Sequence, residues 1–279
     1  MSRIRVVTDS ASDLPEAFAR RLDVDVVSLT IRFGDEEFTD RVDLTPDLFW
    51  AKCKSSKTLP ETAAPSPGAF QAAYERARSD GCDGVIVLTL SSLLSATHQS
   101  ATLAAEAVAG VIDVRVLDTL NVSMGQGLIV IDVAELAPTG ASLDELVAHA
   151  ESLMPKAGVV AALDTLEHLI KGGRVGGAKA LLGQVLSIKP LIELKDGIVA
   201  EAGRQRTRAK ALNAVANVAR SHAPLRRLAL IQGACTDVAA LKALIADIAS
   251  EFPLIITDIG PVVGTHGGPG IIGLTWIEA

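Results

Sequence analysis

The chain has 279 residues, of which 49% are hydrophobic and 21% are charged, so it is long enough for two domains and apolar enough to build a full core. A net charge of −7 and an aromatic content of 3% argue against a nucleic-acid partner, because the acidic surface repels phosphates and few rings are available to stack on bases. The three cysteines form no CxxC pair, no apolar run reaches the roughly 18–20 residues of a membrane span, and no secretory leader is visible. We therefore expect free thiols, a cytoplasmic location and no stable membrane insertion.

Strands and helices alternate through the first half of the sequence. Short β-branched runs predict strands at residues 3–8, 25–33, 84–90 and 114–117. Helical spacing predicts a helix capped by Ser12 or Asp13, followed by helices at residues 45–54, 67–79, 93–109, 123–136 and 142–153. This alternation indicates a parallel sheet with right-handed crossovers. A long Ser/Pro/Thr-rich loop at residues 54–68 interrupts it, and loops of that length favour a functional role.

The pattern changes after residue 157. Strands are predicted at residues 158–163, 188–194, 198–202, 228–232, 254–259 and 270–277, and helices at residues 164–169, 207–221 and 237–250. Gly172 is expected to close the first of these helices in a left-handed conformation. Asp196-Gly197 between two apolar runs is a strong hairpin signal, so the sheet here is mixed. The predicted fold is α/β in two domains, a Rossmann-like parallel-sheet domain at residues 1–157 and an α/β domain with a mixed sheet at residues 158–279.

Polar pairs follow four of the predicted strands, where an open α/β sheet gathers its ligands. They are Asp9-Ser10, Ser91-Ser92, Asp118-Thr119 and Asp164-Thr165. Helix capping explains each pair equally well. Ser91 and Ser92 have a further use, because two hydroxyls and the N–H groups of a helix start can cradle a carboxylate or a phosphate.

Two glycine-rich stretches carry a titratable or charged side chain. The run GPVVGTHGGPG at residues 260–270 surrounds Thr265 and His266, and we interpret it as a loop that forms an anion nest beside an imidazole. The run KGGRVGG at residues 171–177 contains Arg174, which is suited either to an anion or to a domain interface. The stretch GRQRTRAK at residues 203–210 holds four cations, and it is either a solvated helix face or a docking patch for an acidic partner.

The remaining histidines show no metal-ligand spacing. His149, His168 and His222 are expected at the surface or half-buried, whereas His98 follows the serine pair and is expected to line the same cavity. The HExxH, GxSxG, GxxxxGK[ST] and GxGxxG patterns do not occur in a fitting context. A hydrolase built from Ser92, His266 and Asp9 can be drawn, but the spacing alone does not fix its geometry.

Five motifs together give the chain a family resemblance. In order they are VTDSASDLP, LSSLLSATHQSA, TLEHLIKGGRV, IKPLIELKDGIV and GPVVGTHGGPGIIGL, and they span nearly the whole sequence. The chain resembles the DegV family of bacterial fatty-acid-binding proteins. The resemblance implies a two-domain α/β protein that carries a long-chain fatty acid in an apolar tunnel between its domains, needs no cofactor and is not itself an enzyme. It also implies a partner, a separate fatty acid kinase that converts the acid to an acyl phosphate.

The resemblance further implies which residues do this work. The fatty-acid carboxylate is expected on Thr62, Ser92 with Ser91 beside it, and His266. Further candidates for the pocket are Thr265, Arg174, His98 and Ser123, and Arg204 and Arg206 are the candidates for kinase docking.

The chain departs from the family pattern at several positions. Ala63-Ala64 follow Thr62 where the family has Ser-Gln, and Leu93 and Ala96 replace glycines. We expect Leu93 and Ala96 either to alter which acyl chain fits or to make the protein bind a different ligand. Three hypotheses remain at this point. The first is a carrier, in which burial of the tail supplies roughly 0.8 kcal/mol per CH₂. The second is a serine esterase or acyl-transfer enzyme that uses Ser92 and His266, and the third is a binder of some other amphipathic anion.

Overall fold

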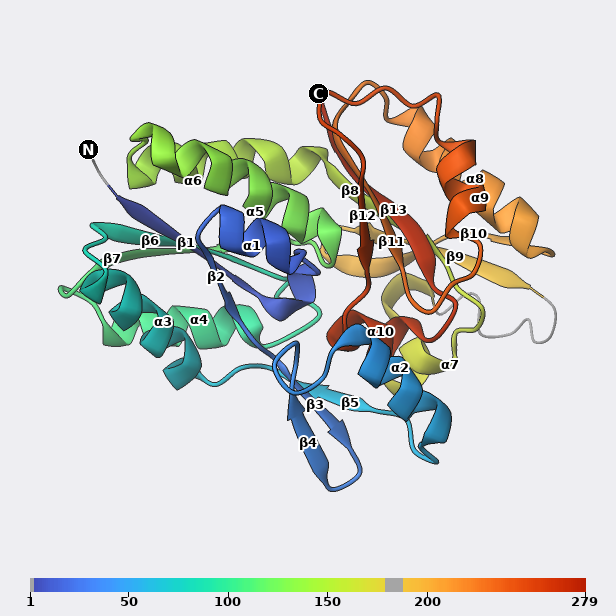
Figure 1. The fold of residues 1–279 in the computed structure, drawn as a ribbon, viewed down its shortest axis with the longest axis horizontal. Helices are drawn as coiled ribbons and strands as arrows, with labels where there is room; N and C mark the ends of the chain where they lie inside the picture. Colours follow the sequence, from blue (N-terminus) through green and yellow to red (C-terminus); the bar gives the residue numbers. More distant parts are fainter. Residues whose placement is uncertain (1–2, 179–187) are drawn as a thin grey trace.

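The computed structural model describes residues 3–178 and 188–279, and its first large element is a four-stranded parallel sheet. The strand order is β2-β1-β6-β7, from β1 (Ile4–Asp9), β2 (Val24–Val27), β6 (Gly84–Thr89) and β7 (Asp113–Asp118). One face is covered by α3 (Pro67–Ser79) and α4 (Thr97–Ala107), and the other by α5 (Met124–Leu136) and α6 (Leu143–Leu153) (Figure 1). Both faces of the sheet are covered, which is why β1 and β6 are buried along their whole length.

A separate six-stranded sheet forms the second half of the molecule. Its order is β10-β9-β8-β13-β11-β12, from β8 (Ala157–Ala162), β9 (Lys189–Lys195), β10 (Ile198–Gln205), β11 (Leu225–Gln232), β12 (Ile255–Asp258) and β13 (Ile272–Glu278). The β11–β12 pair is parallel and the other pairs are antiparallel, so the prediction of a mixed sheet is confirmed. Helices α8 (Arg208–Ser221) and α9 (Val238–Leu244) lie along its outer side (Figure 1).

Helix α5 packs against both large sheets. It contacts β1 and β6 on one side and β8, β11 and β13 on the other. Every residue from Met124 to Ala134 is buried, as expected for a helix that is apolar on all sides. Its buried carboxylate, Asp132, is paired with Arg226 and Arg227 of β11 at 2.6 and 2.5 Å. One apolar core therefore runs through both halves, and the division of the chain at residue 157 stays a prediction.

A third, three-stranded antiparallel sheet was not predicted. Its order is β4-β3-β5, from β3 (Thr30–Phe33), β4 (Glu36–Thr39) and β5 (Glu61–Ala63), and α2 (Pro46–Ser55) packs beside it. The prediction of one strand at residues 25–33 was wrong, because β2 and β3 belong to different sheets. The segment DVVSLTIRF is rich in β-branched residues throughout and has no glycine or proline, so nothing local marks the point where the chain crosses from one sheet to another. The strand β5 lies inside the long loop predicted at residues 54–68.

Several predicted helix boundaries were also wrong. Asp9 caps a short 3₁₀ helix, Ser10–Ser12, and α1 (Glu16–Arg21) follows Pro15. The predicted helix at residues 93–109 begins at Thr97, and the one at residues 237–250 ends at Leu244.

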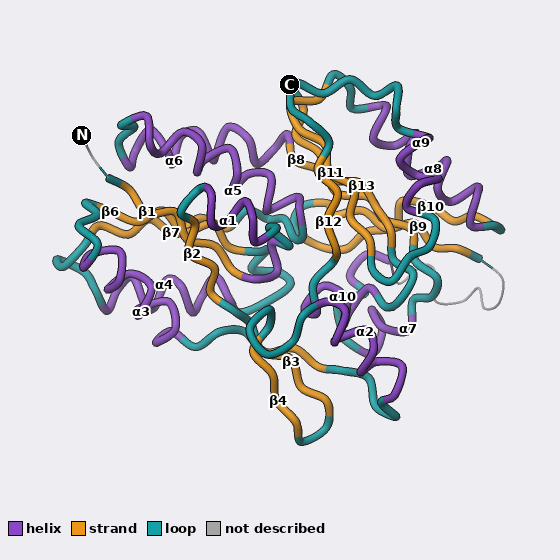
Figure 2. Tube along the Cα trace, viewed as in Figure 1, coloured by secondary structure: helices purple, strands orange, loops and turns teal. Residues whose placement is uncertain are grey.

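The glycine-rich segments also differ from prediction. The region of residues 260–270 contains a helix, α10 (Pro261–Gly267), rather than an open loop (Figure 2). After α7 (Glu167–Lys171), the left-handed glycine is Gly173, with φ 70°, whereas Gly172 has φ −73°.

The predicted hairpin is confirmed. Strands β9 and β10 are joined by Asp196 and Gly197, with φ values of 49° and 79°. Two positive φ angles are the signature of the tight turn that Asp-Gly favours. The tip of this hairpin reaches the parallel sheet, where the Ser91 hydroxyl donates a 2.7 Å hydrogen bond to the Gly197 carbonyl.

Candidate functional site

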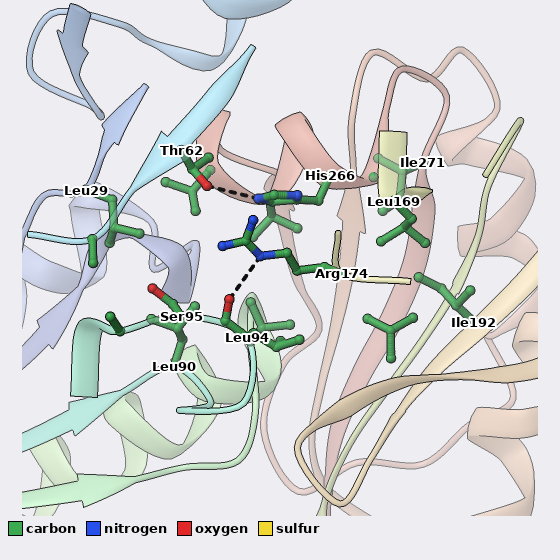
Figure 3. A pocket seen from close by; sticks show the side chains of 17 residues that line it. Leu29, Thr62, Leu90, Leu94, Ser95, Leu169, Arg174, Ile192, His266 and Ile271 are labelled. Carbon is green, nitrogen blue, oxygen red and sulfur yellow. Dashed lines mark hydrogen bonds between the residues drawn. The ribbon is translucent and has the colours of Figure 1, made fainter. Parts of the chain in front are cut away.

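A cavity of about 210 Å³ lies between the two halves, and we call it the inner cavity. Both halves line it (Figure 3). Thirteen of its 17 lining residues are aliphatic or glycine: Leu29, Ala64, Leu90, Leu94, Ala96, Val122, Leu169, Ile192, Val199, Val262, Val263, Gly267 and Ile271. The other four are Thr62, Ser95, Arg174 and His266. An apolar pocket with a few convergent polar groups suits an amphipathic ligand.

Thr62 and His266 meet at the wall of the inner cavity. The Thr62 Oγ1 lies 3.0 Å from Nε2 of His266 (Figure 3). Thr62 is placed by β5, where it pairs with Ile31 of β3, and His266 lies in the last turn of α10. The structure thus brings together two predicted site residues that are 204 positions apart.

The imidazole of His266 is held in its neutral form. Burial, followed by the nearby charges of Arg174 and His168, lowers the pKa of His266 to about 4. A neutral ring carries one N–H, and the tautomer protonated on Nε2 donates to Thr62. The threonine O–H then remains available to donate to a ligand. Within the described residues, Nδ1 of His266 is buried without a hydrogen-bond partner.

Arg174 and Ser95 complete the polar part of the wall. Arg174 Nε donates to the Leu94 carbonyl at 3.1 Å, and a terminal nitrogen donates to the Gly172 carbonyl at 2.6 Å. These bonds use two of the five guanidinium N–H groups. Ser95 Oγ lies 2.9 Å from Thr97 Oγ1 at the start of α4. Figure 3 shows the Arg174 side chain between His266 and the segment that carries Leu94 and Ser95.

The predicted serine pair lies outside the inner cavity. Ser91 is buried and donates to Gly197, while Ser92 is exposed and its backbone N–H donates to the Asp118 carboxylate at 3.2 Å. Neither lines the inner cavity, whereas Ser95 of the same segment does. Ser95 was not predicted as a site residue, because a helix was expected to begin at residue 93. In the structure α4 begins four residues later, and Ser95 lies in the turn before it.

The arrangement does not favour the hydrolase. Among the described residues, His266 has no hydrogen bond to Ser91 or Ser92, and Asp9 accepts from Leu90 and Ala11 N–H groups instead. The nucleophile and base that this alternative requires are therefore not in contact.

Three further pocket candidates do not line the inner cavity, and each makes a hydrogen bond outside it. Ser123 is buried and donates to Asp13 at 2.5 Å. His98 Nδ1 lies 3.1 Å from Thr89 Oγ1, outside the inner cavity. Thr265 donates to the Pro261 carbonyl at 2.8 Å within α10 and faces a neighbouring pocket.

The structure also shows the burial of the remaining residues that the sequence analysis singled out. His168 is buried, contrary to prediction, and its Nδ1 lies 3.1 Å from the Thr265 carbonyl. Arg204 and Arg206, at and just after the end of β10, are exposed, and neither lines the inner cavity. Leu93 is 60% exposed and does not line the cavity, whereas Ala64 and Ala96 do.

Comparison with known proteins points to one family. The family model described as "Uncharacterised protein, DegV family" matches residues 3–279. A DegV domain-containing protein of Deinococcus radiodurans is 37% identical over 97% of each chain.

Solved structures agree in fold. A DegV family protein of Thermus thermophilus, described by its fatty acid binding, shares 35% identity with a TM-score of 0.91, covering 99% of this chain and 100% of that one. A stearic-acid-binding protein of Eubacterium ventriosum shares 26% identity with a TM-score of 0.87, covering 100% and 98%. In the part of the chain that the structure describes, no helix has the length and apolar character needed to cross a bilayer.

Proposed function

The chain belongs to the DegV family, and from this premise we propose that its inner cavity holds a long-chain fatty acid. The carboxylate lies at Thr62, Ser95, Arg174 and His266, and the tail lies among the aliphatic side chains. The observation that carries the proposal is the Thr62–His266 contact in the wall of a mostly aliphatic cavity.

Burial of the tail supplies the affinity. Each CH₂ removed from water contributes roughly 0.8 kcal/mol, so a long chain gains more than about 10 kcal/mol before its ordering costs are subtracted. The thirteen aliphatic and glycine residues of the lining offer the tail no polar group that it would leave unsatisfied.

The head group needs donors that cost little to bury. The hydroxyls of Thr62 and Ser95 are such donors, and the cost of burying the Arg174 charge is offset when it pairs with the carboxylate. His266, in its neutral form, positions the Thr62 hydroxyl through their 3.0 Å contact. Carriage requires no catalytic base. We therefore propose a binding protein without catalytic activity or cofactor rather than an esterase.

We also propose that the bound acid is presented to a separate fatty acid kinase. In that reaction a carboxylate oxygen bonds to the γ-phosphorus of a nucleoside triphosphate, the bond from that phosphorus to the bridging oxygen breaks, and a nucleoside diphosphate leaves. Arg204 and Arg206 are candidates for docking, since they expose positive charge on an acidic protein. Reversing both charges should impair acyl-phosphate formation while leaving bound lipid unchanged.

Mass spectrometry of lipid extracted from the purified protein tests the proposed ligand. We expect a stoichiometric, unmodified long-chain acid from the wild type and a reduced amount from Thr62→Val, which keeps the side-chain shape but removes the hydroxyl. The exposed Thr58→Val is the matched control. Recovery of no lipid, together with hydrolysis of a model ester that Ser92→Ala abolishes, would favour the esterase instead.

A further inference from the structure

Three parts of the molecule meet at a largely buried cluster of charged side chains, Asp13, Asp40 and Arg41, which we call the junction. Asp13 closes the 3₁₀ helix that follows β1 of the parallel sheet. Asp40 and Arg41 follow β4 of the third sheet. Gly260, which precedes α10, donates its N–H to Asp13 at 2.8 Å. The junction therefore connects the parallel sheet, the third sheet and the helix that carries His266.

The junction holds two carboxylates and one guanidinium. One terminal nitrogen of Arg41 lies 3.6 Å from Asp13, and the other donates to the Leu14 carbonyl. Asp13 also accepts two further hydrogen bonds, so its charge is compensated. Neither oxygen of Asp40 has a partner among the described residues, although the side chain is fully buried. Ionisation of both carboxyls therefore leaves a net negative charge buried at Asp40.

The groups around Asp40 decide when it ionises. Burial raises the pKa of Asp40 to about 7, the Ser10 hydroxyl and Arg41 lower it, and the like charge of Asp13 raises it again. Mainly because of burial, the pKa values of Asp13 and of its neighbour Asp9 are raised to about 6. The facing start of α10, residues 260–263, brings no charged side chain. Asp40 is thus the last of these three carboxyls to lose its proton.

Asp40 is joined to the lining of the inner cavity through Leu29. The Asp40 N–H donates to the Leu29 carbonyl at 2.9 Å, and the Leu29 N–H donates to Ser10 Oγ at 3.0 Å. The Leu29 side chain lines the inner cavity (Figure 3). Leu29 leads into β3, in which Ile31 pairs with Thr62 of β5. A displacement of Asp40 therefore moves two parts of the lining, Leu29 and Thr62.

We propose that Asp40 makes the affinity of the inner cavity depend on pH: its protonated carboxyl keeps the third sheet closed over the ligand, and loss of the proton loosens that sheet. This inference rests on the proposed function and adds regulation to the same site. A carboxylate without a partner is too costly to keep buried, so the ionised Asp40 moves toward water. Leu29 and Thr62 move with it, and the ligand loses part of its enclosure.

The affinity for the ligand should fall as the pH rises. The pKa of Asp40 in the closed form lies above its ordinary value of 3.8, so the closed form loses stability as the pH rises through about 7. The ligand binds the closed form, and its apparent affinity falls with the fraction of protein in that form. By reciprocity, binding of the ligand favours the protonated carboxyl and takes up protons from solution near pH 7.

Palmitate titrations of the delipidated full-length protein at pH 6.5 and pH 8.5 test the first consequence. Between these pH values, the dissociation constant of the wild type should rise about fourfold more than that of Asp40→Asn, which has no proton to lose. Both proteins receive the same ligand, so titration of palmitate itself cancels in the comparison. The exposed Asp35→Asn is the matched control and should behave as the wild type does.

Calorimetry in buffers of different ionisation enthalpy tests the second consequence. At pH 7.4 the wild type should take up about 0.3 proton more per bound palmitate than Asp40→Asn does. A structural role of Asp40 without titration would leave the two values equal. Asp40→Leu, which is also neutral and of similar size, provides a second comparison if Asp40→Asn does not fold.

The same pH dependence of affinity in the wild type and in the neutral variant, or the same proton uptake, would overturn the inference while leaving fatty-acid binding intact. Failure of the wild type to bind palmitate at pH 6.5 would overturn the proposed function, and this inference with it.

Discussion

The backbone N–H of Gly260 donates a 2.8 Å hydrogen bond to the carboxylate of Asp13, although the two residues are 247 positions apart. Gly260 is the N-cap residue of α10, the helix that carries His266. The other oxygen of Asp13 accepts from Ser123, at the start of α5. The N-terminal motif VTDSASDLP thus anchors the helix that forms the wall of the inner cavity, and it does not contact the cavity itself.

Asp13→Ala should weaken both the fold and the site. The buried Gly260 N–H and Ser123 hydroxyl lose their partner, which we expect to lower the free energy of unfolding by about 2–4 kcal/mol. Palmitate affinity should fall with it, because α10 is no longer fixed at its start. Chemical denaturation and palmitate titration at a temperature where the variant is folded measure the two effects. The exposed Asp35→Ala is the control, and a folded Asp13→Ala protein with wild-type affinity would contradict the anchoring role.

Asp40→Asn should make the free energy of unfolding less dependent on pH. Neither carboxylate oxygen of Asp40 has a hydrogen-bond partner among the described residues, and burial raises its pKa from 3.8 to about 7. A raised pKa in the folded state means that this group's contribution to stability is complete below pH 3.8 and is lost as the pH rises through about 7. The variant has no proton to lose, so its advantage over the wild type in unfolding free energy should grow by about 2–3 kcal/mol between pH 5 and pH 8.

Denaturant titrations at both pH values measure this difference. Asp35→Asn, an exposed change of the same chemistry, should show no such growth. If the advantage of Asp40→Asn were the same at pH 5 and pH 8, the carboxyl would not be titrating in this range.

Gly172→Ala should displace the imidazole of His266. A Cβ at residue 172 would lie 2.3 Å from Nδ1 of His266, although the backbone φ of −73° accepts alanine. We expect palmitate affinity to fall about tenfold as the ring moves away from Thr62. Gly177→Ala is the matched control, because its Cβ would make only ordinary contacts, at 3.5 Å or more. Similar affinities in the two variants would show that the position of the ring does not matter for binding.

Ser95 and Ser92 should differ in their effect on binding. Ser95 lines the inner cavity, so Ser95→Ala should weaken palmitate binding about ten- to a hundredfold, the value of one hydrogen bond to a charged group. Ser92→Ala should leave the affinity unchanged, since this side chain is exposed. Isothermal titration calorimetry with palmitate compares the two variants. If Ser92→Ala lost more affinity than Ser95→Ala, the carboxylate would instead be bound by the Ser91-Ser92 pair.

Features set by neighbouring residues could be predicted from the sequence. The β-branched runs at residues 3–8 and 84–90 form the buried central strands β1 and β6, and Asp196-Gly197 forms the hairpin turn. These features follow from local backbone preferences and from the period of apolar residues. The third sheet did not follow, because β3 and β5 pair across a separation of about thirty residues and neither strand has a strong local pattern.

For the site, the sequence by itself determined the chemistry: a threonine, a hydroxyl-rich strand end, an arginine and a histidine on an acidic, aliphatic chain. Only the tertiary structure decided which of these hydroxyls lines the inner cavity. Ser91, Ser92 and Ser95 lie in one short turn, and their side chains separate because Ser91 is tied to Gly197 of the other half while Ser95 precedes the true start of α4. Such contacts between distant residues depend on how whole elements pack, and no local preference of the chain encodes them.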